Sequence, residues 1–206
     1  LQGIQSGKLS KCCELGFGQG ISINFHSTLP TMKFYGNDFN KKHVNFANTI
    51  NSLKEAKAEL SDKSFSEYVD NDLPEFDFIM LHGIWSWVAQ SSRDVILEFI
   101  RNKLRVGGVL YISYNTQPGW LDALPIRSVL TDFAKRKLPD KQPTYKKIEE
   151  SKRFLGEFLE TSPQFLKSRP LINKRLDLIN SQTPEYLAHE FFNETWEPFS
   201  FGKIYD

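Results

Sequence analysis

The hydrophobic pattern in the first part of the chain alternates between two periods. Cys12 to Leu15, Thr31 to Gly36 and Phe76 to Leu81 are strand-length runs rich in apolar residues. The last run is nearly continuous, as in a parallel strand covered on both faces. From Asn40 to Leu53 apolar residues recur at helical spacing, which predicts an amphipathic helix with Asn40 as its N-cap and Leu53 on its inner face.

Further elements continue this alternation. They are a first helix from Ile21 to Ser27, a short strand at Ala58 to Leu60, a small helix from Ser64 to Val69, a helix opened by Ser91 or Ser92, and a fifth strand from Val109 to Tyr114. Gly107 and Gly108 are expected to end the unit before the fifth strand. This rhythm of strands and helices predicts a doubly wound α/β sheet.

The pattern changes to helices beyond Trp120. The predicted helices are Leu121 to Leu138, Tyr145 to Leu159, Pro163 to Ile179 and Glu185 to Phe192. We therefore expect a Rossmann-like core over residues 1–118 and a helical insertion or lid over residues 119–206. Lys and Arg are frequent from Lys135 to Arg175, and we favour a solvated helix surface, with a basic rim for an acidic partner as the alternative.

Composition narrows the classes of function. The 206 residues carry a formal charge of +1, so no nucleic-acid partner is expected. The sequence contains no run of about 18 or more apolar residues, so no membrane span is expected. The two cysteines are adjacent and the four histidines are scattered, so we expect no metal site and place the protein in the cytoplasm.

The glycine-rich stretch after the first strand carries the candidate chemistry. Gly16, Gly18 and Gly20 stand at every second position between a strand and a helix, where glycine permits positive φ and lets a ligand approach the backbone. Nucleotide and dinucleotide binders share this device. Two acids add to it: Glu14, which can accept a hydrogen bond from a cationic amine, and Asp38, which closes the second strand where a carboxylate binds ribose hydroxyls.

These residues resemble the first motifs of class I S-adenosylmethionine-dependent methyltransferases. The segments His82 to Val88, Tyr114 to Trp120 and Tyr186 to Asn193 resemble, more specifically, the subgroup that carries a methyltransferase regulatory domain. That subgroup includes bacterial enzymes similar to protein lysine methyltransferases. In it the last segment precedes two further strands, so the resemblance implies a chain that ends before its sheet is complete.

The resemblance implies S-adenosyl-L-methionine as the cofactor. Glu14 and the glycines would line its methionine end, Asp38 would bind the ribose, and Phe39 would flank the adenine. The full set of implied cofactor-binding residues is Glu14, Gly16, Gly18, Gln19, Gly20, Asp38, Phe39, Asp62, Phe65, His82, Gly83 and Trp85. For Asp62 the alternative is a cap on the following small helix, and for Trp85 it is a place in the core.

Methyl transfer needs donor and acceptor held in line and requires neither a metal nor a covalent intermediate. His82, Tyr114 and Asn115 are the candidate catalytic residues, with His82 as a base or a wall of the cofactor site. His82 and Asn115 can equally shape turns. The acceptor is a protein lysine, a small molecule or a surface sugar. A cofactor-binding module without catalysis and an NAD-dependent oxidoreductase remain open as alternatives.

Overall fold

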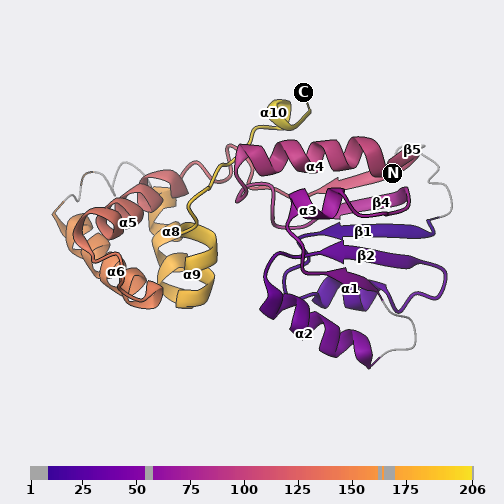
Figure 1. The fold of residues 1–206 in the computed structure, drawn as a ribbon. Helices are drawn as coiled ribbons and strands as arrows, with labels where there is room; N and C mark the ends of the chain where they lie inside the picture. Colours follow the sequence, from indigo (N-terminus) through magenta and orange to yellow (C-terminus); the bar gives the residue numbers. More distant parts are fainter. Residues whose placement is uncertain (1–8, 54–57, 162–163, 165–169, 206) are drawn as a thin grey trace. The chain divides into compact units, whose positions relative to one another are not determined.

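The protein is described by a computed structural model, in which residues 9–53, 58–161, 164 and 170–205 are placed. They form two compact units, one that ends at Tyr114 and one that begins at Asn115 (Figure 1). The predicted boundary between residues 118 and 119 lies close to this division. That the second part serves as a lid stays a prediction.

Parallel strands in the first unit form one sheet. In the described residues its five strands follow the order β3-β2-β1-β4-β5. The strands are β1 (Lys11–Leu15), β2 (Lys33–Asn37), β3 (Glu59–Ser61), β4 (Phe76–Leu81) and β5 (Leu104–Ile112). The order reverses between β1 and β4, which pair directly, and ligands of open α/β sheets bind beyond the strand ends at such a point. The predicted doubly wound α/β fold is confirmed.

Helices pack on the sheet of this unit. They are α1 (Ile21–His26), α2 (Lys41–Ser52), α3 (Phe65–Val69) and α4 (Gln90–Lys103). Side chains alternate across a strand, so neighbouring residues of β1 meet different helices. Cys12 joins a core cluster with Ile23 of α1 and Val44 of α2, whereas Cys13 is hydrogen-bonded to Tyr68 of α3.

Two helices, α3 and α4, begin differently from the sequence prediction. Ser64 caps α3 in a capping box with Glu67, so the alternative that Asp62 caps this helix is wrong. Helix α4 begins at Gln90 after Ala89, ahead of the predicted serines, and the buried Arg93 fixes its first turn by donating from Nε to the Trp85 carbonyl.

The start and the end of α2 differ in how well they were predicted. Asn40 is the N-cap, as predicted, and its side chain accepts a hydrogen bond of 3.1 Å from the Lys42 N–H. Leu53 is 83% exposed, so its predicted inner position is wrong. The helix ends at Ser52, and the residue after it no longer follows the helical face that Val44 and Ala47 bury.

Strand β5 begins earlier than the sequence predicts. It starts at Leu104 directly after α4 and ends at Ile112, so the glycine pair lies inside the strand. A Cβ on Gly108 would lie 2.8 Å from the Leu104 side chain and 3.2 Å from the Asp77 carbonyl oxygen. Gly108 therefore allows close packing of backbone. Gly107 instead has a φ of 81° and no described heavy atom within 4 Å of its Cβ position, and it lies where the pairing of β5 with β4 shifts register.

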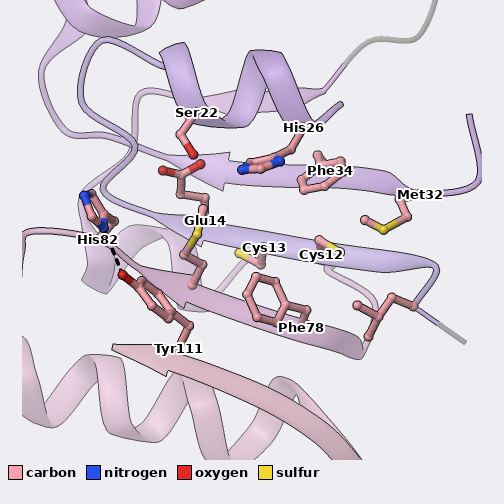
Figure 2. Close-up of a pocket in the computed structure, with 12 residues that line it drawn as sticks. Cys12, Cys13, Glu14, Ser22, His26, Met32, Phe34, Phe78, His82 and Tyr111 are labelled. Atoms are coloured by element: carbon pink, nitrogen blue, oxygen red, sulfur yellow. Dashed lines mark hydrogen bonds between the residues drawn. The ribbon is translucent and has the colours of Figure 1, made fainter. Parts of the chain in front are cut away.

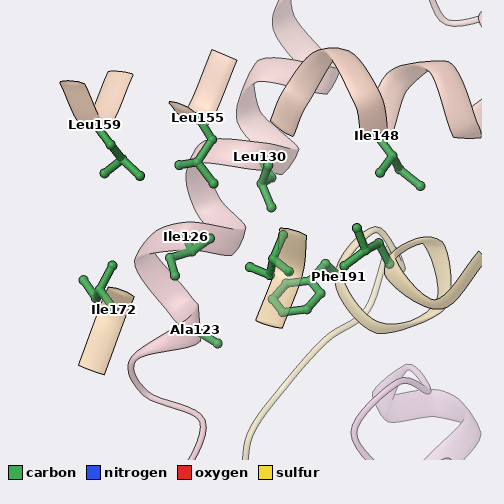
Figure 3. Packing of buried hydrophobic residues seen from close by; sticks show 10 residues of the cluster. Ala123, Ile126, Leu130, Ile148, Leu155, Leu159, Ile172 and Phe191 are labelled. Carbon is green, nitrogen blue, oxygen red and sulfur yellow. The ribbon is translucent and has the colours of Figure 1, made fainter. Parts of the chain in front are cut away.

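The second unit is helical. Its described helices are α5 (Ala123–Lys137), α6 (Thr144–Glu160), α8 (Pro170–Ser181), α9 (Pro184–Phe191) and α10 (Phe201–Tyr205). Figure 3 shows the core shared by α5, α6, α8 and α9, in which Leu130 of α5 and Ile148 of α6 are fully buried with Phe191 of α9. The first part of the predicted helix from Pro163 to Ile179 lies outside the described residues. None of the helices in the described chain has the length and hydropathy of a membrane span.

Candidate cofactor site

The glycine loop forms a tight turn between β1 and α1. Gly16, Gly18 and Gly20 have φ of 66°, 58° and 72°, a region that favours glycine. A Cβ on Gly16 would lie 2.2 Å from Ile84 Cδ1, and one on Gly20 would lie 2.4 Å from Ala47 Cβ. A Cβ on Gly18 would have no heavy atom within 4 Å among the described residues. The outer glycines thus fit the loop into the fold, and the middle one faces open space.

Asp38 fixes this loop to the end of β2. Its Oδ2 accepts a hydrogen bond of 2.9 Å from the Gly18 N–H, and its Oδ1 accepts one of 2.9 Å from the Asn40 N–H. The Asn37 carbonyl oxygen accepts from the N–H of Gly16 at 2.8 Å. The carboxylate is buried, and its backbone partners hold it beside the open side of Gly18. The structure thus joins the two motifs that the sequence singled out.

Glu14 lines a cavity of about 560 Å³ in the first unit (Figure 2). Its side chain is only 4% exposed, and Oε2 has no hydrogen-bond partner in the described part of the chain. Burial raises the pKa of Glu14 to about 7, although a hydrogen bond from Ser22 lowers it in part. A buried carboxyl group with an unused oxygen is suited to a ligand that brings a positive charge or a donor.

His82 and Tyr111 lie at the same cavity. Nδ1 of His82 is 3.3 Å from the Tyr111 hydroxyl, and the two rings stack with centroids 6.1 Å apart (Figure 2). Ser113 lies 3.5 Å from the same Nδ1 and accepts a 2.7 Å hydrogen bond from the Gly83 N–H. The Ser113 hydroxyl thus contacts both the Gly83 turn and His82. That His82 acts as a base stays a prediction.

Tyr111 and Ser22 were not among the predicted site residues. Tyr111 pairs with Met80 in the β4–β5 register, which places its ring on the cavity side together with the Met80 side chain. The sequence alone does not fix that register, because the two strands are joined through a helix. Ser22 is the second residue of α1, directly after the glycine loop, and this position in the sequence could have been a signal for its hydrogen bond to Glu14.

Of the predicted cofactor residues, Glu14 and His82 line the cavity, whereas the loop glycines, Asp38 and the remaining ones do not. Phe39 is 74% exposed just after Asp38, and Asp62 follows β3 with Lys41 Nζ 3.9 Å from its carboxylate. The ring of Phe65 lies close to Gly16, 3.6 Å from where its Cβ would be. Gln19 in the glycine loop is exposed, while Trp85 is buried and only 7% exposed. The ligand contacts assigned to these residues stay predictions.

Tyr114 and Asn115 stand at the junction of the two units. Asn115 is buried in the second unit and donates from Nδ2 to Oε1 of Glu190 in α9 at 3.2 Å. Burial raises the pKa of Glu190, while the Asn115 hydrogen bond lowers it in part. Glu190 lies in the last of the segments that the sequence singled out, but its pairing with a residue 75 positions away was not predictable. The catalytic roles of Tyr114 and Asn115 stay predictions.

Metal ligands do not gather in the described part of the chain, where no group of three His, Cys, Asp or Glu side chains could hold a metal ion. The candidate site consists of the glycine loop, the two buried acids and the His82–Tyr111 pair.

Comparisons with known proteins agree with this arrangement. No protein-family model matches the chain. It is 39% identical over 209 residues to the uncharacterized protein sll1526 of Synechocystis, and the alignment covers 99% of this chain and 41% of that protein. It is 28% identical over 190 residues to the uncharacterized protein RP028 of Rickettsia prowazekii, covering 90% of this chain and 73% of that protein.

Among solved structures, the chain resembles PKMT2 from Rickettsia typhi, with a TM-score of 0.74 and 27% identity over 98% of this chain and 38% of that chain. The complex of PKMT2 with AdoHcy gives a TM-score of 0.75 with 24% identity, covering 98% and 39%. The chain therefore spans about two fifths of the length of PKMT2 and of the Synechocystis protein. With the observed sheet order, this likeness shows that the chain has the fold of the class I S-adenosylmethionine-dependent methyltransferases.

Proposed function

We propose that this protein binds S-adenosyl-L-methionine and transfers its methyl group to a nucleophilic acceptor. The observation that carries the proposal is the glycine loop held by Asp38 next to a buried, incompletely paired Glu14. Both acids stand at the carboxyl ends of neighbouring strands, Glu14 on β1 and Asp38 after β2. The strand order reverses between β1 and β4, so Glu14 lies next to the reversal point. The complex of PKMT2 with AdoHcy supports the choice of cofactor.

The residues present fit this cofactor at both of its polar ends. The unused Oε2 of Glu14 would accept a hydrogen bond from the α-ammonium group, and Asp38 would accept from the ribose hydroxyls. The open side of Gly18 lets the ligand approach the backbone. The residues that would hold the adenine and the remaining walls are Phe39, Asp62, Phe65, Gly83 and Trp85.

When bound, the cofactor supplies a methyl group on a positively charged sulfur, which is open to in-line displacement. The protein's own contribution is to hold the acceptor in line, with reacting atoms about 3 to 3.5 Å apart. His82 would receive a proton from the acceptor or form part of the wall, since its Nδ1 already meets the Tyr111 hydroxyl. Tyr114 and Asn115 would orient the acceptor.

A protein lysine is the acceptor that we propose. The likeness to PKMT2, whose name denotes a protein lysine methyltransferase, supports it and extends over 98% of this chain. A small molecule or a surface sugar is the alternative acceptor. Because PKMT2 and the Synechocystis protein are longer than this chain, substrate recognition by the whole protein is part of the proposal.

Two measurements test the function in sequence. Isothermal titration with S-adenosylhomocysteine and with NAD separates a methyltransferase from a nicotinamide-dependent oxidoreductase, and we expect binding of the former only. Incubation of the protein with radiolabelled S-adenosylmethionine and cell lysate should then label protein, with methyllysine recovered after hydrolysis. Binding without any labelled product would indicate a cofactor-binding module, and tight binding of NAD alone would overturn the proposal.

A further inference from the structure

His43 approaches the carboxylate that we assign to the ribose. It lies in the first turn of α2, and its Nδ1 is 3.4 Å from Oδ1 of Asp38. This nitrogen is buried and makes no hydrogen bond within the described residues, although the side chain as a whole is 39% exposed. A buried ring nitrogen this close to a buried carboxylate oxygen, with no hydrogen bond in the described residues, needs an explanation.

The remaining contacts of Asp38 are made by backbone. The N–H groups of Gly18 and Asn40 each occupy one acceptor position, on Oδ2 and Oδ1 respectively. A carboxylate offers about four acceptor positions, so these two bonds leave about two, enough for one sugar hydroxyl and one further donor. Asn40 also caps α2 with its own side chain, which fixes the first turn and with it the Cα of His43.

We propose that His43 is a positioning residue for Asp38. In this role its Nδ1–H donates to Oδ1, while the Gly18 N–H donates to Oδ2. The two contacts together fix the plane of the carboxylate that faces the sugar hydroxyls. This inference rests on the proposed function, because it requires Asp38 to bind the ribose of the cofactor. It assigns a role to a residue that neither the glycine loop nor the strand ends contain.

Three variants at this position separate the proposal from a general packing role. His43→Leu removes the donor. His43→Asn keeps a nitrogen at the position of Nδ1, whereas His43→Gln moves it toward the position of Nε2. We expect S-adenosylhomocysteine to bind His43→Leu and His43→Gln about 5- to 10-fold more weakly, as for loss of a long hydrogen bond to a charged group, and His43→Asn within about 2-fold of wild type. Asn45→Leu, an exposed polar-to-apolar change in the same helix, is the matched control.

A ligand comparison shows whether the effect passes through the sugar. Isothermal titration with 5′-methylthioadenosine and with its 2′,3′-dideoxy analogue should show the loss in His43→Leu for the first ligand only. The Asp38→Asn and His43→Leu losses should also be less than additive in the double variant, since both act on one contact. Melting temperatures of the variants check that folding is preserved.

Three results would overturn the inference: wild-type affinity in His43→Leu, equal recovery by Asn and Gln, or equal losses for both ligands. If wild-type protein binds S-adenosylhomocysteine and Asp38→Asn weakens it while His43→Leu does not, this inference alone fails. If wild-type protein does not bind S-adenosylhomocysteine at all, the proposed function fails and the inference fails with it.

Discussion

Replacing Glu14 with Gln removes a carboxyl group that holds its proton up to about pH 7 in the folded protein. In an unfolded chain the same group loses its proton near its ordinary value of 4.5. Between these two values the folded state binds more protons than the unfolded state, so the free energy of unfolding falls as the pH rises. Each pKa unit corresponds to about 1.4 kcal/mol, so the loss reaches about 3 kcal/mol by pH 8.

Urea unfolding of wild type and Glu14→Gln at pH 5 and pH 8 measures this difference. Wild type should lose about 2.5 kcal/mol between the two conditions, or roughly 5 to 10 °C in melting temperature, and Glu14→Gln should lose less than about 1 kcal/mol. Glu98→Gln, a change at an exposed residue of α4, should behave like wild type. Equal pH dependence in wild type and Glu14→Gln would refute the assignment of a raised pKa to Glu14.

The cofactor should reverse this dependence. An ammonium group next to Oε2 favours the ionised carboxylate, so binding of S-adenosylhomocysteine near pH 7 should release a proton from Glu14. Titration in two buffers of different ionisation enthalpy detects that proton. Its release from wild type and its absence in Glu14→Gln would place the ammonium group at this residue, whereas equal release from both proteins would place it elsewhere.

Other substitutions test the fold around the site. Gly20→Ala should lower the melting temperature strongly, because its φ of 72° and the approach to Ala47 both disfavour a side chain. Gly18→Ala should cost only about 1 kcal/mol of stability, because its Cβ would face open space among the described residues. Titration should nevertheless show that Gly18→Ala weakens S-adenosylhomocysteine binding. Asp77→Ala should cost about 2 to 4 kcal/mol in urea unfolding, because the buried carboxylate accepts from Ser10 and Lys11 and pairs with Arg105 at 2.6 Å. Although burial raises the pKa of Asp77, those hydrogen bonds and Arg105 lower it overall, so this contribution should vanish only as the pH falls below 3.8. In the second unit, Leu130→Ala should cost about 2 to 5 kcal/mol, seen as an earlier unfolding transition.

Local features of the fold were predictable because their causes are local. The apolar run from Phe76 to Leu81 is strand β4 with the predicted bounds, and Asn40 caps α2 through its own side chain. Gly108 of β5 was misinterpreted, because a glycine required by close approach looks in sequence like one required by a turn. That approach involves Asp77 of another strand as well as Leu104 and Arg105 of the same strand.

The parts of the site that the sequence did not indicate depend on pairing between distant segments. Tyr111 reaches the cavity through the β4–β5 register, and Glu190 meets Asn115 across 75 residues. Neither contact leaves a periodic or spacing signal in the chain. The glycines and the two acids were found because they lie at or just beyond the carboxyl ends of β1 and β2, where the α/β architecture itself places a ligand.

The two acids differ in environment, and that difference gives the proposed site a direction. Asp38 has each oxygen fixed by a backbone N–H, which suits it to hydroxyl groups that donate to an oriented carboxylate. Glu14 is buried with one oxygen unused and a raised pKa, which suits it to a ligand that brings its own positive charge. A ligand with an ammonium group at one end and a diol at the other would satisfy both acids in a single orientation. S-adenosylmethionine has this polarity, whereas reversing it would set a diol against Glu14 and an ammonium group against an already paired Asp38.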